Sequence, residues 1–113
     1  MLIYISYFVS KSGYYFRPKL FPAFISVEPA NFCQLHCPEC PVGTKSNGRT
    51  SKETMNYGLF EQIVDELKSH LTHIIFYFQG EPLLDPGLAK KIALAHNAKI
   101  FTSLSTNAQI LNK

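Results

Sequence analysis

Residues 31–43 read Asn-Phe-Cys-Gln-Leu-His-Cys-Pro-Glu-Cys-Pro-Val-Gly and contain all three cysteines of the 113-residue chain. Cys33, Cys37 and Cys40 follow the spacing Cys-x3-Cys-x2-Cys, so their thiolates can turn toward one centre. Soft thiolate ligands select zinc, copper(I) or iron-sulfur clusters over ions that prefer oxygen. This stretch therefore predicts a metal site.

The number of cysteines separates two kinds of metal site. Structural zinc usually has four protein ligands that come as two pairs, and the second pair is missing here. His36, His70 or His73 could supply a fourth ligand, but none has the spacing that zinc modules favour. A [4Fe-4S] cluster on three cysteines would instead keep one iron open for a substrate or cofactor. The motif favours a cluster with a chemical role, and a non-enzymatic zinc or interaction module is the alternative.

The composition is that of a folded domain, with 46% hydrophobic and 17% charged residues. A chain of 113 residues has room for one ordinary domain. The net charge of +3 is spread without a run of like charges, so no nucleic-acid partner is indicated. An odd number of cysteines in one loop is a poor disulfide framework, which favours a reducing compartment and predicts a cytoplasmic protein.

Residues 1–22 form an N-terminal segment and connector ahead of a domain at 23–113. The apolar part, residues 1–9, is too short for a bilayer span of about 20 residues. It also lacks the basic start and the cleavage site of a signal peptide. We expect it to dock on the domain as a helix or strand, with a peripheral membrane contact as the alternative. No transmembrane segment is predicted.

Strand patterns occur three times after residue 22. Short apolar runs predict strands at 23–27, 73–78 and 100–104. The run at 73–78 shows no alternation, which is typical of a parallel strand covered on both faces and places its aromatic residues 76–78 in the core.

Helix patterns lie between these strands. After Asn56, a candidate N-cap, apolar residues recur up to Leu71 with the spacing of an amphipathic helix. Asp85 as cap and Pro86 as first residue predict the start of a second helix, and Gln109 resembles the start of a third. Strands that alternate with helices predict an α/β fold with a parallel sheet and right-handed crossovers.

Polar motifs follow each predicted strand. The cysteines follow the first strand, residues 79–82 (Gln-Gly-Glu-Pro) follow the second, and residues 105–107 (Ser-Thr-Asn) follow the third. In parallel α/β folds ligands bind beyond the carboxyl ends of the strands, so the three motifs should meet at one edge. Gly80 allows close backbone approach, and the Glu81 carboxylate suits a cationic amine. Ser105 and Asn107 suit ribose hydroxyls or a carboxylate.

Taken together, the motifs resemble those of the radical S-adenosylmethionine (radical SAM) enzymes over about residues 23–111, and the setting of the cysteines resembles the branch with SPASM-type extensions. The resemblance implies the N-terminal part of a partial (β/α) TIM-like barrel, truncated after about three βα units. It also implies a [4Fe-4S] cluster on Cys33, Cys37 and Cys40, with S-adenosylmethionine (SAM) as the second cofactor.

The resemblance carries over to further residues one by one. The family's Gly-Gly-Glu-Pro motif contacts the amino group of SAM, which makes Gln79, Gly80 and Glu81 candidate SAM-binding residues, and Gln79 stands where the family has its first glycine. Residues 105–108 resemble the family's Ser-Thr-Asn-Gly segment, so Ser105 and Asn107 are candidates too. Glu39 stands where many members have an aromatic residue against the adenine.

The implied activity is reductive cleavage of SAM to methionine and a 5'-deoxyadenosyl radical that abstracts hydrogen from a substrate. A flavodoxin- or ferredoxin-like protein would donate the electron. The substrate stays open between a peptide, a small metabolite and a nucleoside. An eight-stranded barrel takes about 250 residues, so we expect the 113-residue chain alone to be inactive and to be poorly soluble or oligomeric.

Overall fold

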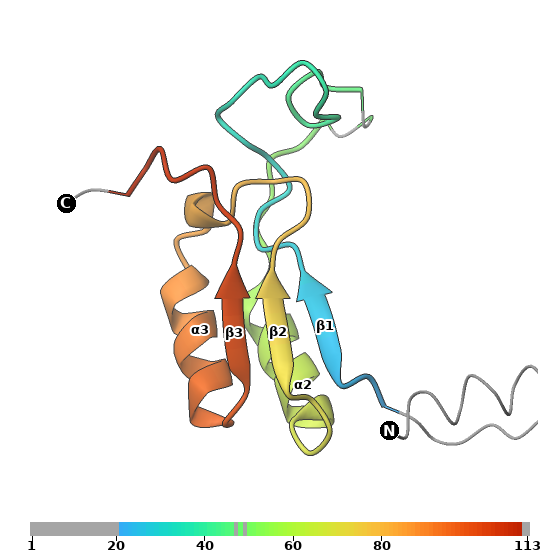
Figure 1. Ribbon diagram of the computed structural model, residues 1–113, viewed down its shortest axis with the longest axis vertical. Helices are drawn as coiled ribbons and strands as arrows, with labels where there is room; N and C mark the ends of the chain where they lie inside the picture. Colours follow the sequence, from blue (N-terminus) through green and yellow to red (C-terminus); the bar gives the residue numbers. More distant parts are fainter. Residues whose placement is uncertain (1–20, 47, 49, 112–113) are drawn as a thin grey trace, which may run out of the picture.

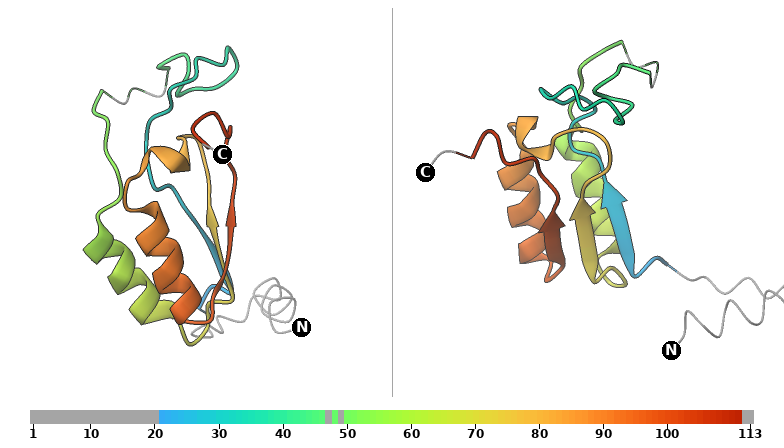
Figure 2. Two further views of the ribbon diagram at one scale, coloured as in Figure 1. Left: turned by 90° about the vertical axis from the view of Figure 1, so that its left-hand side faces the viewer. Right: turned by 45° about the horizontal axis from the view of Figure 1, so that its top comes forward.

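The computed structural model shows a three-stranded parallel sheet with two helices on one of its faces (Figures 1 and 2). It describes residues 21–46, 48 and 50–111, so the predicted docking of residues 1–9 lies outside the described residues. The elements are β1 (Phe24–Val27), α2 (Tyr57–Leu67), β2 (His73–Phe76), the 3-10 helix η1 (Pro82–Leu84), α3 (Leu88–Asn97) and β3 (Phe101–Leu104). The predicted order of strand, helix, strand, helix, strand is confirmed.

The sheet order is β1-β2-β3, and both strand pairs are parallel. Val27 of β1 lies opposite Phe76 of β2, and Phe76 lies opposite Leu104 of β3. The carboxyl ends of all three strands therefore reach the same edge. This register brings the segments that follow the strands together.

The core lies between the sheet and the two helices. Phe60 and Val64 of α2 pack with Ile74 and Phe76 of β2, and the rings of Phe60 and Phe76 lie 5.6 Å apart. The predicted N-cap is confirmed, because the Asn56 side chain accepts a hydrogen bond from the Leu59 backbone N–H at 3.2 Å. No helix in the described part of the chain is long and apolar enough to cross a membrane.

The described chain covers the sheet on one face only, as Figure 2 shows. Phe24 and Phe101, on the opposite face, are 62% and 68% exposed. The prediction that residues 73–78 are covered on both faces is thus wrong for the described residues. The strand ends at Phe76, which is buried, whereas Tyr77 and Phe78 are exposed beyond it. Their placement in the core was also wrong, because the chain leaves the sheet before them.

The second helix begins later than predicted. Asp85 closes η1, and α3 starts at Leu88 with Gly87 as its N-cap. The Asp85 carboxylate accepts from the Gly87 N–H at 2.8 Å and from Lys91 Nζ at 2.6 Å. Both side chains of this ion pair are almost fully buried, at 2% and 1% exposure. The ion pair links η1 to α3. It therefore stabilises the position of the residues that directly follow Glu81.

The third predicted helix does not begin at Gln109 within the described residues. Residues 109–110 form a turn, and Leu111 follows without regular structure.

Candidate metal and cofactor site

The three segments that follow the strands meet above the carboxyl edge of the sheet (Figure 1). They enclose an open cavity of about 290 Å³. All predicted site residues line it, namely Cys33, Cys37, Cys40, Gln79, Gly80, Glu81, Ser105 and Asn107. Leu35, Tyr77, Phe78 and Thr106 complete the lining. The structure thus brings the predicted residues together at the carboxyl edge of the sheet. The binding role of each residue stays a prediction.

Two turns shape the cysteine loop. The Cys40 N–H donates to the Cys37 carbonyl at 3.1 Å, and the Thr44 N–H and hydroxyl both donate to the Cys40 carbonyl, at 2.9 and 3.0 Å. Gly43 lies directly against this loop, because a Cβ there would stand 2.7 Å from both the nitrogen and the oxygen of Cys37. Sequence reasoning missed Gly43. Its place just after the last cysteine was the available signal.

The three thiols are soft donors of the kind that an iron-sulfur cluster uses. Cys33 and Cys40 are half-buried, Cys37 is exposed, and all three are free. Within residues 21–46, 48 and 50–111, no three His, Cys, Asp or Glu side chains come together closely enough for one metal ion. In a [4Fe-4S] cluster each thiolate binds a different iron, so its ligands are spread around the cluster. Three soft donors around one cavity therefore fit that group.

The histidines of the zinc alternative lie apart. His73 is the first residue of β2, at the edge of the sheet opposite the cysteines, and accepts from or donates to the Ser103 hydroxyl at 2.8 Å. His70 precedes it and stacks on Phe21 with ring centroids 4.5 Å apart. Only His36, inside the cysteine loop, remains near the three thiols.

Gly80 has a clear structural reason to lack a side chain. A Cβ at this position would stand 1.8 Å from the Ala30 carbonyl oxygen. The neighbouring Glu81 N–H donates to the Phe32 carbonyl at 2.9 Å. The backbone after β2 therefore packs against the backbone that leads into Cys33, which is the close approach that Gly80 permits in the structure.

Glu28 anchors the same turn. Its Oε1 accepts from the N–H groups of Gln79 and Gly80, each at 3.1 Å. Since Glu28 directly follows β1, this contact ties the turn after β2 to the start of the cysteine segment. Only the long-range register of the two strands reveals that contact.

The Glu81 carboxylate is 3% exposed and connects the turn after β2 with the segment after β3. Oε1 accepts from the Leu83 N–H at 3.0 Å and from the Thr106 hydroxyl at 2.6 Å, and Oε2 accepts from the Asn107 N–H at 2.8 Å. A carboxylate offers about four acceptor positions. Three are used within the chain, so Glu81 fixes the shape of the site besides any contact with a ligand amine.

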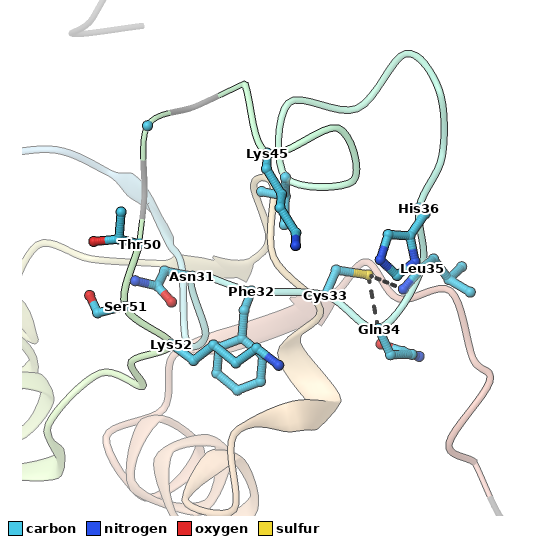
Figure 3. Close-up of a pocket in the computed structure, with 12 residues that line it drawn as sticks. Asn31, Phe32, Cys33, Gln34, Leu35, His36, Lys45, Thr50, Ser51 and Lys52 are labelled. Atoms are coloured by element: carbon cyan, nitrogen blue, oxygen red, sulfur yellow. Dashed lines mark hydrogen bonds between the residues drawn. The ribbon is translucent and has the colours of Figure 1, made fainter.

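A second cavity, of about 590 Å³, adjoins the first and shares Cys33 and Leu35 with it. Figure 3 shows Lys45 and Lys52 reaching toward it from opposite sides. The Lys52 ammonium stands 5.7 Å from the centroid of the Phe32 ring, within the range of a cation–π contact. The wall of this cavity is positively charged.

The model of the radical SAM superfamily matches residues 27–113. No curated protein matches. The crystal structure of BtrN in complex with AdoMet and 2-DOIA has a TM-score of 0.70 and 25% identity over 81% of this chain and 38% of that chain. Selenomethionine BtrN in an open conformation has a TM-score of 0.69 and 23% identity over 84% of this chain and 43% of that chain.

The chain thus spans less than half the length of these solved structures. Their likeness covers the three parallel strands and the helices between them, which correspond to part of a radical SAM barrel. The family match covers most of the chain, including all three cysteines. The chain belongs to the radical SAM superfamily.

Proposed function

We propose that Cys33, Cys37 and Cys40 hold a [4Fe-4S] cluster and that the adjoining strand ends bind SAM. The observation that carries this proposal is the shared cavity, which is lined by all three thiols and by both polar motifs. These residues would hold the cluster and SAM next to each other, and the bound cluster would supply the electron for reductive cleavage of SAM and hydrogen abstraction from a substrate. The similar BtrN structure was solved with AdoMet, which supports SAM as the cofactor.

The chain's own residues supply position and exclusion of water. Leu35, Tyr77 and Phe78 give the cavity an apolar wall beside the thiols. Gly80 and Glu81 hold the turn whose backbone would face the SAM amino group, and Ser105 would face its polar parts. Glu81 also keeps Thr106 and Asn107 in place. These bonds within the chain shape the cavity.

Partners and compartment are part of the same proposal. A cluster of this type takes its electron from a flavodoxin- or ferredoxin-like protein, and three free cysteines suit a reducing, cytoplasmic compartment. A peptide is one candidate substrate, and it would contact parts of the barrel beyond β3. Membership in the SPASM-type branch is supported only by the residues around the cysteines.

Addition of SAM should change the electron paramagnetic resonance spectrum of the reduced protein. We expect Glu81→Ala to raise the SAM concentration for the half-maximal change at least about tenfold, because one lost hydrogen bond to a charged group is worth about 1.5–3 kcal/mol. The exposed Glu61→Ala on α2 is the matched control and should behave like the unchanged protein. A spectrum that stays the same at saturating SAM would contradict the cofactor role.

A further inference from the structure

We propose that Asn107 is a positioning residue for Cys33, and that its side-chain amide raises the reduction potential of the bound cluster by donating a hydrogen bond to the Cys33 sulfur. The role rests on the proposed function, because it requires Cys33 to be a cluster ligand. It differs from a contact between Asn107 and SAM, since it acts without SAM. The relevant atoms belong to segments 74 residues apart in the sequence.

The Cys33 sulfur accepts two N–H groups. Asn107 Nδ2 lies 3.4 Å from Sγ, and the Leu35 backbone nitrogen also lies 3.4 Å from it. As a thiol, Cys33 donates to Gln34 Oε1 at 3.6 Å, and a metal-bound thiolate keeps only the two accepted bonds (Figure 3 shows the Leu35 and Gln34 contacts). Among the described residues, no side-chain hydrogen bond reaches the sulfur of Cys37 or Cys40. Cys33 therefore differs from the other two cysteines in the hydrogen bonds that its sulfur accepts.

The orientation of the Asn107 amide is fixed by its other partners. Oδ1 accepts from the Gln109 N–H at 3.0 Å and from Gln34 Nε2 at 3.1 Å. Since the oxygen faces two donors, the amino group is the part that faces sulfur. The Asn107 backbone N–H is held by the buried Glu81 carboxylate at 2.8 Å. Two bonds thus hold the Asn107 side chain and a third holds its backbone.

A hydrogen bond to a cluster thiolate stabilises the more negative, reduced state more than the oxidised state. Hydrogen bonds to the sulfurs are among the factors that set the potential of iron-sulfur clusters. Partners of metal ligands also fix the orientation of those ligands. Loss of the Asn107 amino group should therefore make the cluster harder to reduce, whether or not SAM is present.

Two variants of the reconstituted protein separate the hydrogen bond from charge. Asn107→Asp keeps the oxygen that accepts from Gln109 and Gln34 but loses the donor and adds a negative charge. Asn107→Leu loses the donor without adding charge. Asn97→Asp, an exposed change at the far end of α3, is the matched control. Each protein is titrated electrochemically without SAM, with the reduced fraction followed by electron paramagnetic resonance and the iron content measured.

We expect both Asn107 variants to lower the ratio of reduced to oxidised cluster about tenfold at a fixed applied potential, which equals about 59 mV for a one-electron couple. Asn97→Asp should keep the original potential. If Asn107→Asp holds no cluster, the potential of Asn107→Leu decides. An unchanged potential in Asn107→Leu overturns the role of Asn107 while the cluster itself stands. If the protein without substitutions takes up no cluster, that result would instead overturn the proposed function.

Discussion

Alanine at Cys33, Cys37 or Cys40 is expected to abolish cluster binding almost completely. The chain has three cysteines, and all of them line the same cavity. Two thiolates would leave two irons without protein ligands, and a cluster held in that way does not withstand solvent. Cys37 gives the sharpest test, because it is exposed and its side chain supports no core packing. The measurement is the visible absorbance and the iron and sulfide content after anaerobic reconstitution.

The matched control for this experiment is His36→Ala. His36 lies in the same loop and is the one histidine of the zinc alternative that remains near the thiols. We expect it to keep a full cluster. A normal cluster after Cys37→Ala would contradict the ligand assignment, whereas loss of metal in His36→Ala would favour a site of the zinc type.

The second large effect concerns the buried ion pair behind the site. Asp85→Ala leaves the Lys91 ammonium buried at 1% exposure without its carboxylate partner. Removal of one member of a buried pair typically lowers the free energy of unfolding by about 3–5 kcal/mol. Since η1 follows Glu81 directly, loss of the pair should also loosen the turn that lines the cavity. Chemical denaturation of the unchanged and variant proteins measures the loss.

Two comparisons make this test specific. Asp65 pairs with Lys68 on the exposed face of α2 at 2.8 Å, with side-chain exposures of 64% and 55%. Asp65→Ala should change the stability by at most about 1 kcal/mol, as is usual for surface pairs. The double variant Asp85→Leu/Lys91→Met should recover most of the loss, because apolar residues can replace a buried pair at little cost. Equal effects of Asp85→Ala and Asp65→Ala would contradict the role of the buried pair.

The sequence predicted the fold and the place of the site because both depend on local signals. Apolar runs followed by Gly, Pro and polar residues indicated where each strand ends, and three motifs at three strand ends indicated one shared edge. The cysteine spacing predicts the ligand set in the same way, and that set stays a prediction. The structure places all three motifs around one cavity.

Contacts between residues far apart in the chain could not be predicted from the sequence. Asp85 reads as a helix cap, and only its burial beside Lys91 shows the ion pair. Glu81 reads as a ligand for an amine, whereas the structure adds bonds to Thr106 and Asn107. Tyr77 and Phe78 were predicted to be core residues because they are hydrophobic and continue the apolar run. Hydrophobicity alone does not show that the strand ends before them. Each difference arises from the register of elements that are distant in sequence.

In the proposed function, the three cysteines hold one [4Fe-4S] cluster with an iron open for SAM. The most direct test is Mössbauer spectroscopy of the protein after anaerobic reconstitution with iron-57, together with metal analysis. We predict a brown protein with about four iron and four sulfide per chain, in which added SAM changes the signal of one iron. A colourless protein that binds zinc in a one-to-one ratio and takes up no iron would contradict it.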